Sequence, residues 1–290
     1  MPDWATIDQH IGEATGQPFA TRDARAVGGG CINSAYVLSD GKRGFFIKLN
    51  HAARLAMFKA EAEGLNDILH SRSIRAPAPL CHGVAANEAY LVLEHLPLGG
   101  QGSAERLGRE LAQMHRCQHE RFGWRRDNTI GATPQINTEE TDWVRFWQQH
   151  RLGHQLRLAA EKGGHLGAPA EQLLARTGDF FGDDQPRPSL LHGDLWSGNH
   201  AYTEDGQPVI FDPAVYYGDR ETDLAMTELF GGFPPTFYAA YEEAWPLDPG
   251  YATRKTLYNL YHILNHFNLF GGGYLEQARH MIAQLLSEVR

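Results

Sequence analysis

The stretch of residues 189–213, SLLHGDLWSGNHAYTEDGQPVIFDP, carries the residues that decide the fold and the chemistry of this chain. It begins and ends with short apolar runs bounded by Gly, Asp and Pro, a pattern typical of buried strands. A polar loop between the runs holds Asp194 and, five residues later, Asn199, and Asp212 follows the second run. Two strands flanking such a loop would hold two carboxylates and one amide around a single point.

These three side chains suit a metal-dependent transfer of a phosphoryl group from ATP. Such a transfer needs a carboxylate that orients the attacking hydroxyl, and oxygen ligands for a Mg²⁺ ion that bridges the phosphates. In protein kinases the catalytic Asp precedes a metal-binding Asn by the same five residues, and a metal-binding Asp follows on the next strand. This parallel makes Asp194 the candidate catalytic residue and Asn199 with Asp212 the candidate metal ligands. The alternative is that Asp and Asn simply occupy loop positions, as these residues often do.

The length, composition and net charge of the chain limit the classes of protein to which it can belong. Its 290 residues suffice for one large or two modest domains, and 42% apolar with 21% charged residues is ordinary for a soluble protein. The formal charge of -9 argues against a nucleic-acid partner, because phosphate backbones are bound mainly by Lys and Arg. We find neither a signal-peptide pattern nor a run of about 18 apolar residues, so we expect no membrane partner and a cytoplasmic location.

A glycine-rich turn lies between two apolar segments near the N-terminus and consists of Gly28, Gly29 and Gly30. Glycines allow the backbone to approach a ligand closely, and successive N–H groups can cradle phosphate oxygens. The turn is therefore a candidate nucleotide-binding element, although an ordinary hairpin also uses glycine.

A lysine embedded in an apolar run strengthens the nucleotide hypothesis. Lys48 lies in the predicted strand 44–49, and a predicted amphipathic helix, 54–70, follows it. Glu61 lies near the border of the apolar stripe of that helix, whereas the competing Glu63 falls farther round. A strand lysine paired with a helix glutamate is how kinases aim the lysine at the α- and β-phosphates. An isolated lysine in such a run otherwise extends to solvent.

A boundary between two lobes is predicted near residues 97–102, where a buried strand ends at Pro and Gly residues. We therefore expect an N-terminal domain of residues 1–97 and a C-terminal domain of residues 98–290. The connector would offer backbone N–H and C=O groups to an adenine edge, unless it is an ordinary linker. These connector residues are Glu94, His95 and Leu96.

Beyond the connector the patterns are mainly helical. The predicted helices cover residues 103–118, 141–161, 254–270 and 274–289, and residues 163–188 carry no readable motif. Asp223 fits either a helix N-cap or a buried acid that braces the catalytic loop. His262 and His266 have a spacing that can bind zinc, but no third ligand is evident, so packing or contact with a polar substrate is favoured.

The order of these motifs resembles the protein-kinase-like superfamily, and His-Gly-Asp followed by Phe-Asp-Pro resembles its small-molecule branch, which includes aminoglycoside and choline kinases. The runs that resemble the fructosamine (ketosamine) kinase family cover nearly the whole chain. These runs are residues 28–32, 192–199, 211–214, 216–226, 228–233 and 261–271.

The resemblance implies an α+β, two-lobed kinase fold with a β-rich N-lobe, a larger helical C-lobe and ATP between them. It implies an enzyme that uses ATP and Mg²⁺ to phosphorylate a sugar hydroxyl of a free or protein-bound ketoamine, and so repairs glycation. Asp194 would accept or orient the hydroxyl proton, and Lys48, braced by Glu61, would hold phosphates. The residues expected to form the sugar pocket are Trp196, His262, Asn265 and His266.

Two rival functions stay open. One is another phosphotransferase of the aminoglycoside or choline type, and the other is a non-catalytic protein that retains a nucleotide cleft. Against the second, all five polar residues of the transfer machinery are present.

The three cysteines, Cys31, Cys81 and Cys117, form neither a disulfide framework nor a metal-site pattern. Cys31 directly follows the glycine-rich turn, where oxidation or adduct formation would add bulk at the phosphates. We predict a monomer or homodimer in which Cys31 is a redox-sensitive position able to join two chains by a disulfide. The alternative is that Cys31 is a small packed hydrophobe.

Overall fold

The computed structural model describes residues 2–28, 32–182 and 185–289. The chain divides into two compact units, one of residues 1–102 and 201–212 and the other of residues 103–200 and 213–290. This division differs from the predicted one chiefly in residues 201–212, which return to the first unit after the catalytic loop. None of the helices in the described ranges is both long and apolar enough to cross a membrane.

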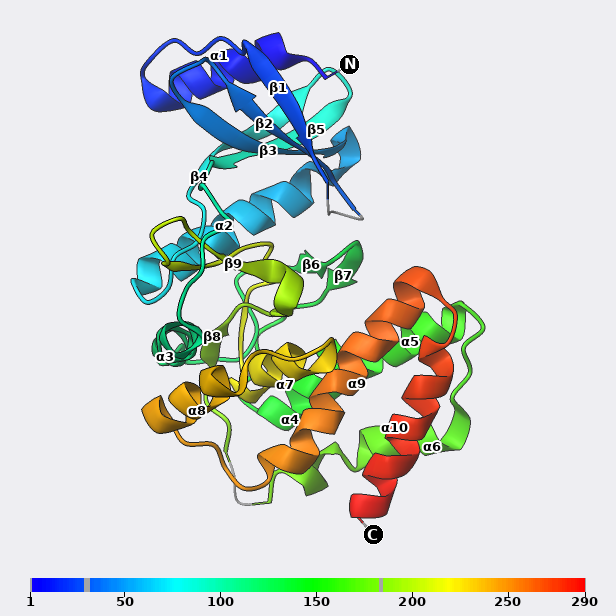
Figure 1. The fold of residues 1–290 in the computed structure, drawn as a ribbon. Helices are drawn as coiled ribbons and strands as arrows, with labels where there is room; N and C mark the ends of the chain where they lie inside the picture. Colours follow the sequence, from blue (N-terminus) through cyan, green and yellow to red (C-terminus); the bar gives the residue numbers. More distant parts are fainter. Residues whose placement is uncertain (1, 29–31, 183–184, 290) are drawn as a thin grey trace. The chain divides into compact units, whose positions relative to one another are not determined.

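The first unit is built on an antiparallel sheet of five strands in the order β1-β2-β3-β5-β4 (Figure 1). The strands are β1 (Asp23–Val27), β2 (Ser34–Ser39), β3 (Gly44–His51), β4 (Pro79–Ala85) and β5 (Glu88–Glu94). The helices α1 (Trp4–Thr15) and α2 (Leu55–Ser71) pack against this sheet, and β9 (His200–Tyr202) and β10 (Pro208–Ile210) form a separate two-stranded pair.

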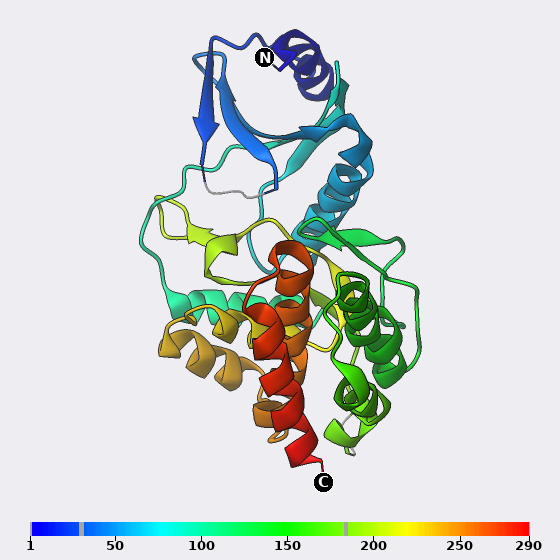
Figure 2. The same cartoon turned by 90° about the vertical axis from the view of Figure 1, so that its right-hand side faces the viewer.

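The alternation of side chains along β3 explains why the two helices cover opposite faces of this sheet. Ile47 and Leu49 are buried in a core cluster with Ile7 and Ile11 of α1. Because successive side chains of a strand point to opposite faces, Lys48 must point to the other face. That face is covered by α2, and Figures 1 and 2 show the sheet between the two helices.

The second unit is mainly helical, as its patterns predict. Its helices are α3 (Ala104–His115), α4 (Trp143–Phe146), α5 (Gly153–Glu161), α6 (Gly167–Ala175), α7 (Glu221–Leu229), α8 (Pro235–Ala244), α9 (Tyr251–Phe270) and α10 (Tyr274–Glu288). Its short strands are β6 (Asn128–Ile130), β7 (Thr133–Gln135), β8 (Ser189–Leu191) and β11 (Tyr216–Gly218). The expectation of an α+β fold, with a β-rich N-terminal part and a larger helical part, is confirmed. Figures 1 and 2 show α9 and α10 side by side.

Local sequence signals account for several of these boundaries. The Ser103 hydroxyl accepts a hydrogen bond from Arg106 N at 3.0 Å and so caps α3. A six-residue π-helical segment, Trp147–Leu152, interrupts the predicted helix 141–161 between α4 and α5. Residues 163–188, which carried no readable motif, contain α6 and a short 3-10 turn.

The close packing of α3 against α8 depends on a missing side chain. A Cβ built on Gly108 would lie 2.4 Å from the carbonyl oxygen of Phe237. Any larger residue would therefore push the helices apart, because the obstacle is backbone. This contact fixes how closely α3 and α8 approach each other.

Candidate active site

In the first unit, the predicted lysine and glutamate come together. Lys48 Nζ contacts the Glu61 carboxylate and also lies 2.6 Å from Asp212 Oδ1. Lys48 is almost fully buried. Burial favours the neutral amine, but the charges of Asp212 and Glu61 outweigh it and raise the pKa of Lys48 above its ordinary value. The lysine is therefore a fixed cation, as phosphate binding requires.

Asp212 has a backbone conformation that few non-glycine residues adopt. Its φ is 58°, in the left-handed region, where an L side chain is strained. Its side chain stays 50% exposed beside the buried ammonium group. Backbone strain held by surrounding structure is common at functional sites. In Asp212 the strained backbone holds a carboxylate that pairs with the buried Lys48 and still reaches solvent.

In the predicted adenine-binding connector, the backbone N–H of Glu94 already has a hydrogen-bond partner. Glu94 N donates a 2.8 Å hydrogen bond to Ala78 O, and the Glu94 side chain forms an ion pair with Arg75. The Glu94 N–H is therefore used within the first unit. Gly29, Gly30 and Cys31 lie outside the described residues, so their predicted roles stay predictions, and a Cβ built on Gly28 meets no atom within 4 Å.

In the second unit, the catalytic loop holds Asp194 next to Asn199. Asn199 Nδ2 donates to Asp194 O at 2.8 Å and approaches Asp194 Oδ2 at 3.4 Å. The Asn199 side chain is buried. With its NH₂ group turned to Asp194, the amide presents its oxygen as the atom that can bind a cation. The structure thus brings these two predicted residues together.

The backbone before Asp194 needs glycine. Gly193 has a φ of 83°, and a Cβ built on it would lie 2.1 Å from Ala214 O. Ala214 N in turn donates to His192 O at 2.8 Å. The chain on either side of the loop is therefore in direct backbone contact, which explains the glycine of the His-Gly-Asp motif.

Asp223 braces this loop, which was one of its two predicted roles. Its Oδ2 accepts a hydrogen bond from His192 N at 2.7 Å, and its Oδ1 accepts one from Gly193 N at 2.8 Å. Burial opposes the charge, yet the hydrogen bond and charge of His115 and these backbone donors lower the pKa of Asp223 below its ordinary value. Asp223 lies inside α7 and makes no N-cap contact.

A chain of hydrogen bonds extends the brace and was not predicted. His115 Nε2 lies 3.1 Å from Asp223 Oδ2, and His115 Nδ1 lies 2.8 Å from the Tyr241 hydroxyl. Arg220 Nη1 donates to the same hydroxyl at 3.3 Å. His115 follows Leu111 by one helical turn, so its place on the apolar stripe of the predicted helix was the available signal.

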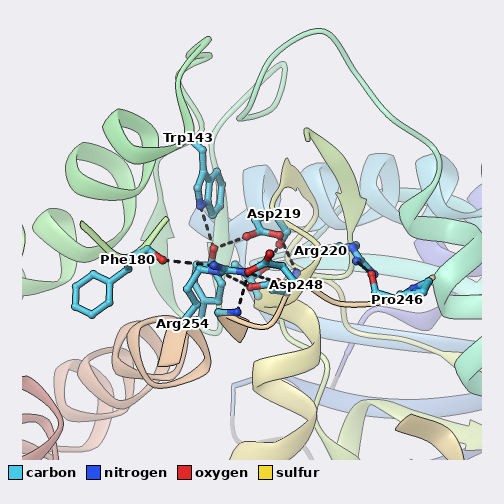
Figure 3. A network of polar contacts seen from close by, with 11 residues as sticks. Trp143, Phe180, Asp219, Arg220, Pro246, Asp248 and Arg254 are labelled. Atoms are coloured by element: carbon cyan, nitrogen blue, oxygen red, sulfur yellow. Dashed lines mark hydrogen bonds and ion pairs between the residues drawn. The ribbon is translucent and has the colours of Figure 1, made fainter. Parts of the chain in front are cut away.

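A second buried network anchors the segment that carries Asp223 (Figure 3). Arg254 of α9 binds both carboxylate oxygens of Glu221, with Nε–Oε2 and Nη2–Oε1 distances of 2.7 and 2.8 Å. Tyr258, one turn along α9, donates a short hydrogen bond to Asp219 and accepts one from Trp143 Nε1 at 3.1 Å. The segment 219–223 is thus fixed to α9 through the side chains of Asp219 and Glu221.

The four residues expected to form the sugar pocket differ in their accessibility. Trp196 is 38% exposed and His266 is half-buried, whereas His262 and Asn265 are buried. Burial lowers the pKa of His262 to about 3, and its Nδ1 has no hydrogen-bond partner in the described part of the chain. Within that part, no group of three His, Cys, Asp or Glu residues gathers to bind a metal.

The comparisons with known proteins cover nearly the whole chain. The model of the family described as "Fructosamine kinase" matches residues 3–288. The chain is 53% identical over 286 residues to "Probable ketoamine kinase" of Synechocystis sp., covering 98% of this chain and 97% of that protein. It is 43% identical to "Protein-ribulosamine 3-kinase, chloroplastic" of Arabidopsis thaliana, covering 90% and 82%.

Comparison with solved structures points to the same family. The crystal structure titled "Putative fructosamine-3-kinase" from Haemophilus somnus matches with a TM-score of 0.91 and 31% identity over 98% of this chain and 97% of that one. An aminoglycoside phosphotransferase in complex with ADP and hygromycin B has a TM-score of 0.62 at 16% identity over 97% and 98%, a likeness of fold alone. The chain belongs to the fructosamine kinase family.

Proposed function

We propose that this chain transfers the γ-phosphate of ATP to a sugar hydroxyl of ketoamines, and thereby repairs glycated amines. Family membership supports the reaction class and the acceptor. The observation that supports catalysis is the loop of Asp194, which is held by a glycine turn, by Asn199 and by the double brace from Asp223. A loop this firmly fixed suits a reaction that depends mainly on positioning.

Asp194 is proposed to orient the attacking hydroxyl and accept its proton. Its loop position is set by hydrogen bonds to backbone atoms, so the carboxylate needs no rearrangement to meet the acceptor. General-base catalysis of this kind typically contributes about 10²–10⁴ in rate. Trp196, exposed two residues after Asp194, is proposed to contact the sugar.

Lys48 is proposed to hold the phosphates of ATP, oriented by Glu61. The Lys48 ammonium is buried between carboxylates, and Asp212 is the partner that keeps solvent access. A Mg²⁺ ion fits the donor set, because it prefers oxygen ligands and both the Asn199 amide oxygen and the Asp212 carboxylate supply them. When bound, the ion would neutralise charge on the phosphates.

The location and the oligomeric state remain predictions. We propose the cytoplasm, and a monomer or a homodimer that a Cys31 disulfide joins under oxidation. The plant relatives are described as chloroplastic, a statement about those proteins.

A panel of acceptors tests the proposed function. The purified chain with Mg²⁺-ATP is offered fructose-lysine, ribulose-lysine, erythrulose-lysine, choline and kanamycin, and the catalytic efficiency for each is measured. We expect the ketoamines to be preferred and Asp194→Asn, which keeps the size of the side chain, to abolish turnover. A preference for choline or kanamycin would replace the proposal by one of its rivals, and ATP binding without any transfer would indicate a non-catalytic protein.

A further inference from the structure

Three aromatic rings in the second unit gather around the ring of His266. The ring centroids of Phe230, Phe270 and Tyr274 lie 4.8, 5.8 and 5.2 Å from that of His266. We call these four residues the His266 aromatic cluster. The rings come from the segment after α7, from the C-terminal part of α9 and from the start of α10, so the fold rather than local sequence assembles them.

The cluster reaches the surface. Phe270 is 58% exposed, and it and Trp196 are the large hydrophobic side chains classed as exposed among the described residues of the second unit. A Cβ built on Gly231, Gly271 or Gly272 meets no atom within 4 Å, so the glycine segments beside the cluster border open space. Phe230, His266 and Tyr274 are half-buried beside Phe270, so the four rings form one partly open apolar surface of the kind that binding sites use.

One short segment connects the cluster to the catalytic loop. Phe230 lies at the start of the segment 230–233, and Phe233 at its end packs on His200 with ring centroids 4.4 Å apart. His200 shares a hydrogen bond with the backbone of Trp196, the residue proposed to contact the sugar. The segment 230–233 therefore links the cluster, along the chain and through the ring of His200, to the loop that carries Trp196 within one unit.

Helix α9 carries two rings of the cluster and sets the spacing between them. Burial and, to a smaller extent, the charge of Asp194 raise the pKa of Tyr261, whose ring centroid lies 5.1 Å from that of the neighbouring His262. His266 and Phe270 follow one and two turns later, at about 6 Å of helix rise per four residues. His266 therefore lies one turn of α9 beyond His262, and Phe270 lies one turn beyond His266.

We propose that the His266 aromatic cluster is the subsite for the amine-bearing part of the ketoamine: the protonated secondary amine and the alkyl stem of a lysine side chain. This inference rests on the proposed function, in which the sugar lies at Asp194. Aromatic faces attract an organic cation, and their apolar surface covers methylene groups. A lysine adduct, with a stem of four methylenes, gains both contacts, whereas the adduct of a short amine reaches only the nearer rings.

The charge of the cluster suits this ligand. Burial lowers the pKa of His266, against the opposing effect of its 2.8 Å hydrogen bond to the His262 carbonyl. The imidazole is accordingly uncharged at neutral pH and does not repel a cation. None of the four rings carries a positive charge, so the amine meets only neutral aromatic surfaces.

The test uses two ketoamines that share one sugar and differ in the amine. The substrates are fructosyl-lysine with its α-amino group blocked and the fructosyl adduct of methylamine, and the measured quantity is the ratio of their catalytic efficiencies. We expect Phe270→Ala and Tyr274→Leu each to lower the lysine-to-methylamine ratio about 3–10-fold, mainly through KM. Phe270→Trp should restore the ratio. Val84→Ala, which shortens an exposed apolar side chain on β4 of the first unit, is the matched control and should leave the ratio within twofold.

The outcomes separate the subsite from the activity. If Phe270→Ala lowers the efficiency of both ketoamines equally, or of neither, the subsite inference is wrong while the ketoamine kinase activity stands. If the unmodified chain phosphorylates neither ketoamine, the proposed function fails and the subsite fails with it. Because Phe270 is exposed, we expect the variants to keep the melting temperature of the parent, which shows that the ratio reports binding rather than folding.

Discussion

The Asp223 carboxylate accepts a 2.8 Å hydrogen bond from the backbone N–H of Gly193, the residue directly before Asp194. Its second oxygen accepts from the N–H of His192, so one buried carboxylate fixes two consecutive peptide groups. A carboxylate is an acceptor only and can satisfy both donors at once. Asp223 of α7 thus sets the position of Asp194 by holding the two residues that precede it in the loop.

Replacing Asp223 should therefore impair turnover without removing nucleotide binding. In Asp223→Asn the amide keeps the size but offers an NH₂ group toward a backbone donor, so one hydrogen bond is lost and the loop shifts. We expect kcat to fall about 10–100-fold and stability to fall by about 1–3 kcal/mol. Steady-state kinetics, ATP binding by calorimetry and urea unfolding measure the three effects. Glu243→Gln, at an exposed surface pair, is the control. A normal kcat in folded Asp223→Asn would contradict the bracing role.

Asp194 and Asp212 should give distinguishable defects. Asp194→Ala removes the proposed base and should lower kcat by about 10²–10⁴ while ATP still binds. Asp212→Asn weakens a proposed ligand and should raise the Mg²⁺ concentration needed for half-maximal rate. Rates measured across a Mg²⁺ titration separate the two variants. Full turnover in Asp194→Ala would remove it from catalysis, and an unchanged Mg²⁺ requirement in Asp212→Asn would remove that residue from the ligand set.

The ion pair between Glu221 and Arg254 should matter for stability. Both side chains are buried, and Glu221→Gln would leave Asp248, whose side chain is 45% exposed, as the remaining carboxylate partner of the guanidinium. Breaking a buried pair by removing one charge typically costs about 3–5 kcal/mol. We expect Glu221→Gln to lower the free energy of unfolding by an amount near this range. Glu276→Gln disrupts an exposed pair on α10 and should cost less than about 1 kcal/mol. Equal losses in the two variants would contradict this account of the network.

Periodicity and motif spacing predicted the parts of the site that depend on single elements. The apolar run around Lys48 and the stripe near Glu61 placed both residues on one face of their elements, and the structure brings them together. The strand-loop-strand pattern around Asp194 and Asn199 likewise placed two residues that the fold brings into contact. In each case the information lies within a few residues of the group concerned.

The unpredicted parts depend on contacts between distant residues. His115 meets Asp223 across 108 positions and Tyr241 across 126, and no local pattern encodes such a pairing. The two readings of Asp223 could not be separated for the same reason, since its partners are backbone groups of another element. The return of residues 201–212 to the first unit was missed because no composition change marks it.

The buried His262 should give stability a distinct dependence on pH. Burial lowers its pKa in the folded chain to about 3, from an ordinary value of 6.5. Between these two values the unfolded chain binds a proton at this position and the folded chain does not. Stability should therefore be lost as the pH falls from about 6.5 toward 3, by up to about 1.4 kcal/mol per pH unit from this residue. Above pH 6.5 the residue should contribute no dependence.

Urea unfolding of the parent chain and of His262→Leu, at pH 4.5, 5.5, 6.5 and 7.5, measures this contribution as the difference between two curves. Leucine is similar in size to histidine and has no titratable group. In the described part of the chain the His262 Nδ1 has no hydrogen-bond partner, so the substitution leaves no group unpaired at that atom. We expect the parent to lose stability more steeply than His262→Leu below pH 6.5, with parallel curves above it. His280→Leu, on the exposed side of α10, should follow the parent throughout. Parallel curves for the parent and His262→Leu down to pH 4.5 would show that His262 is not held neutral by the fold.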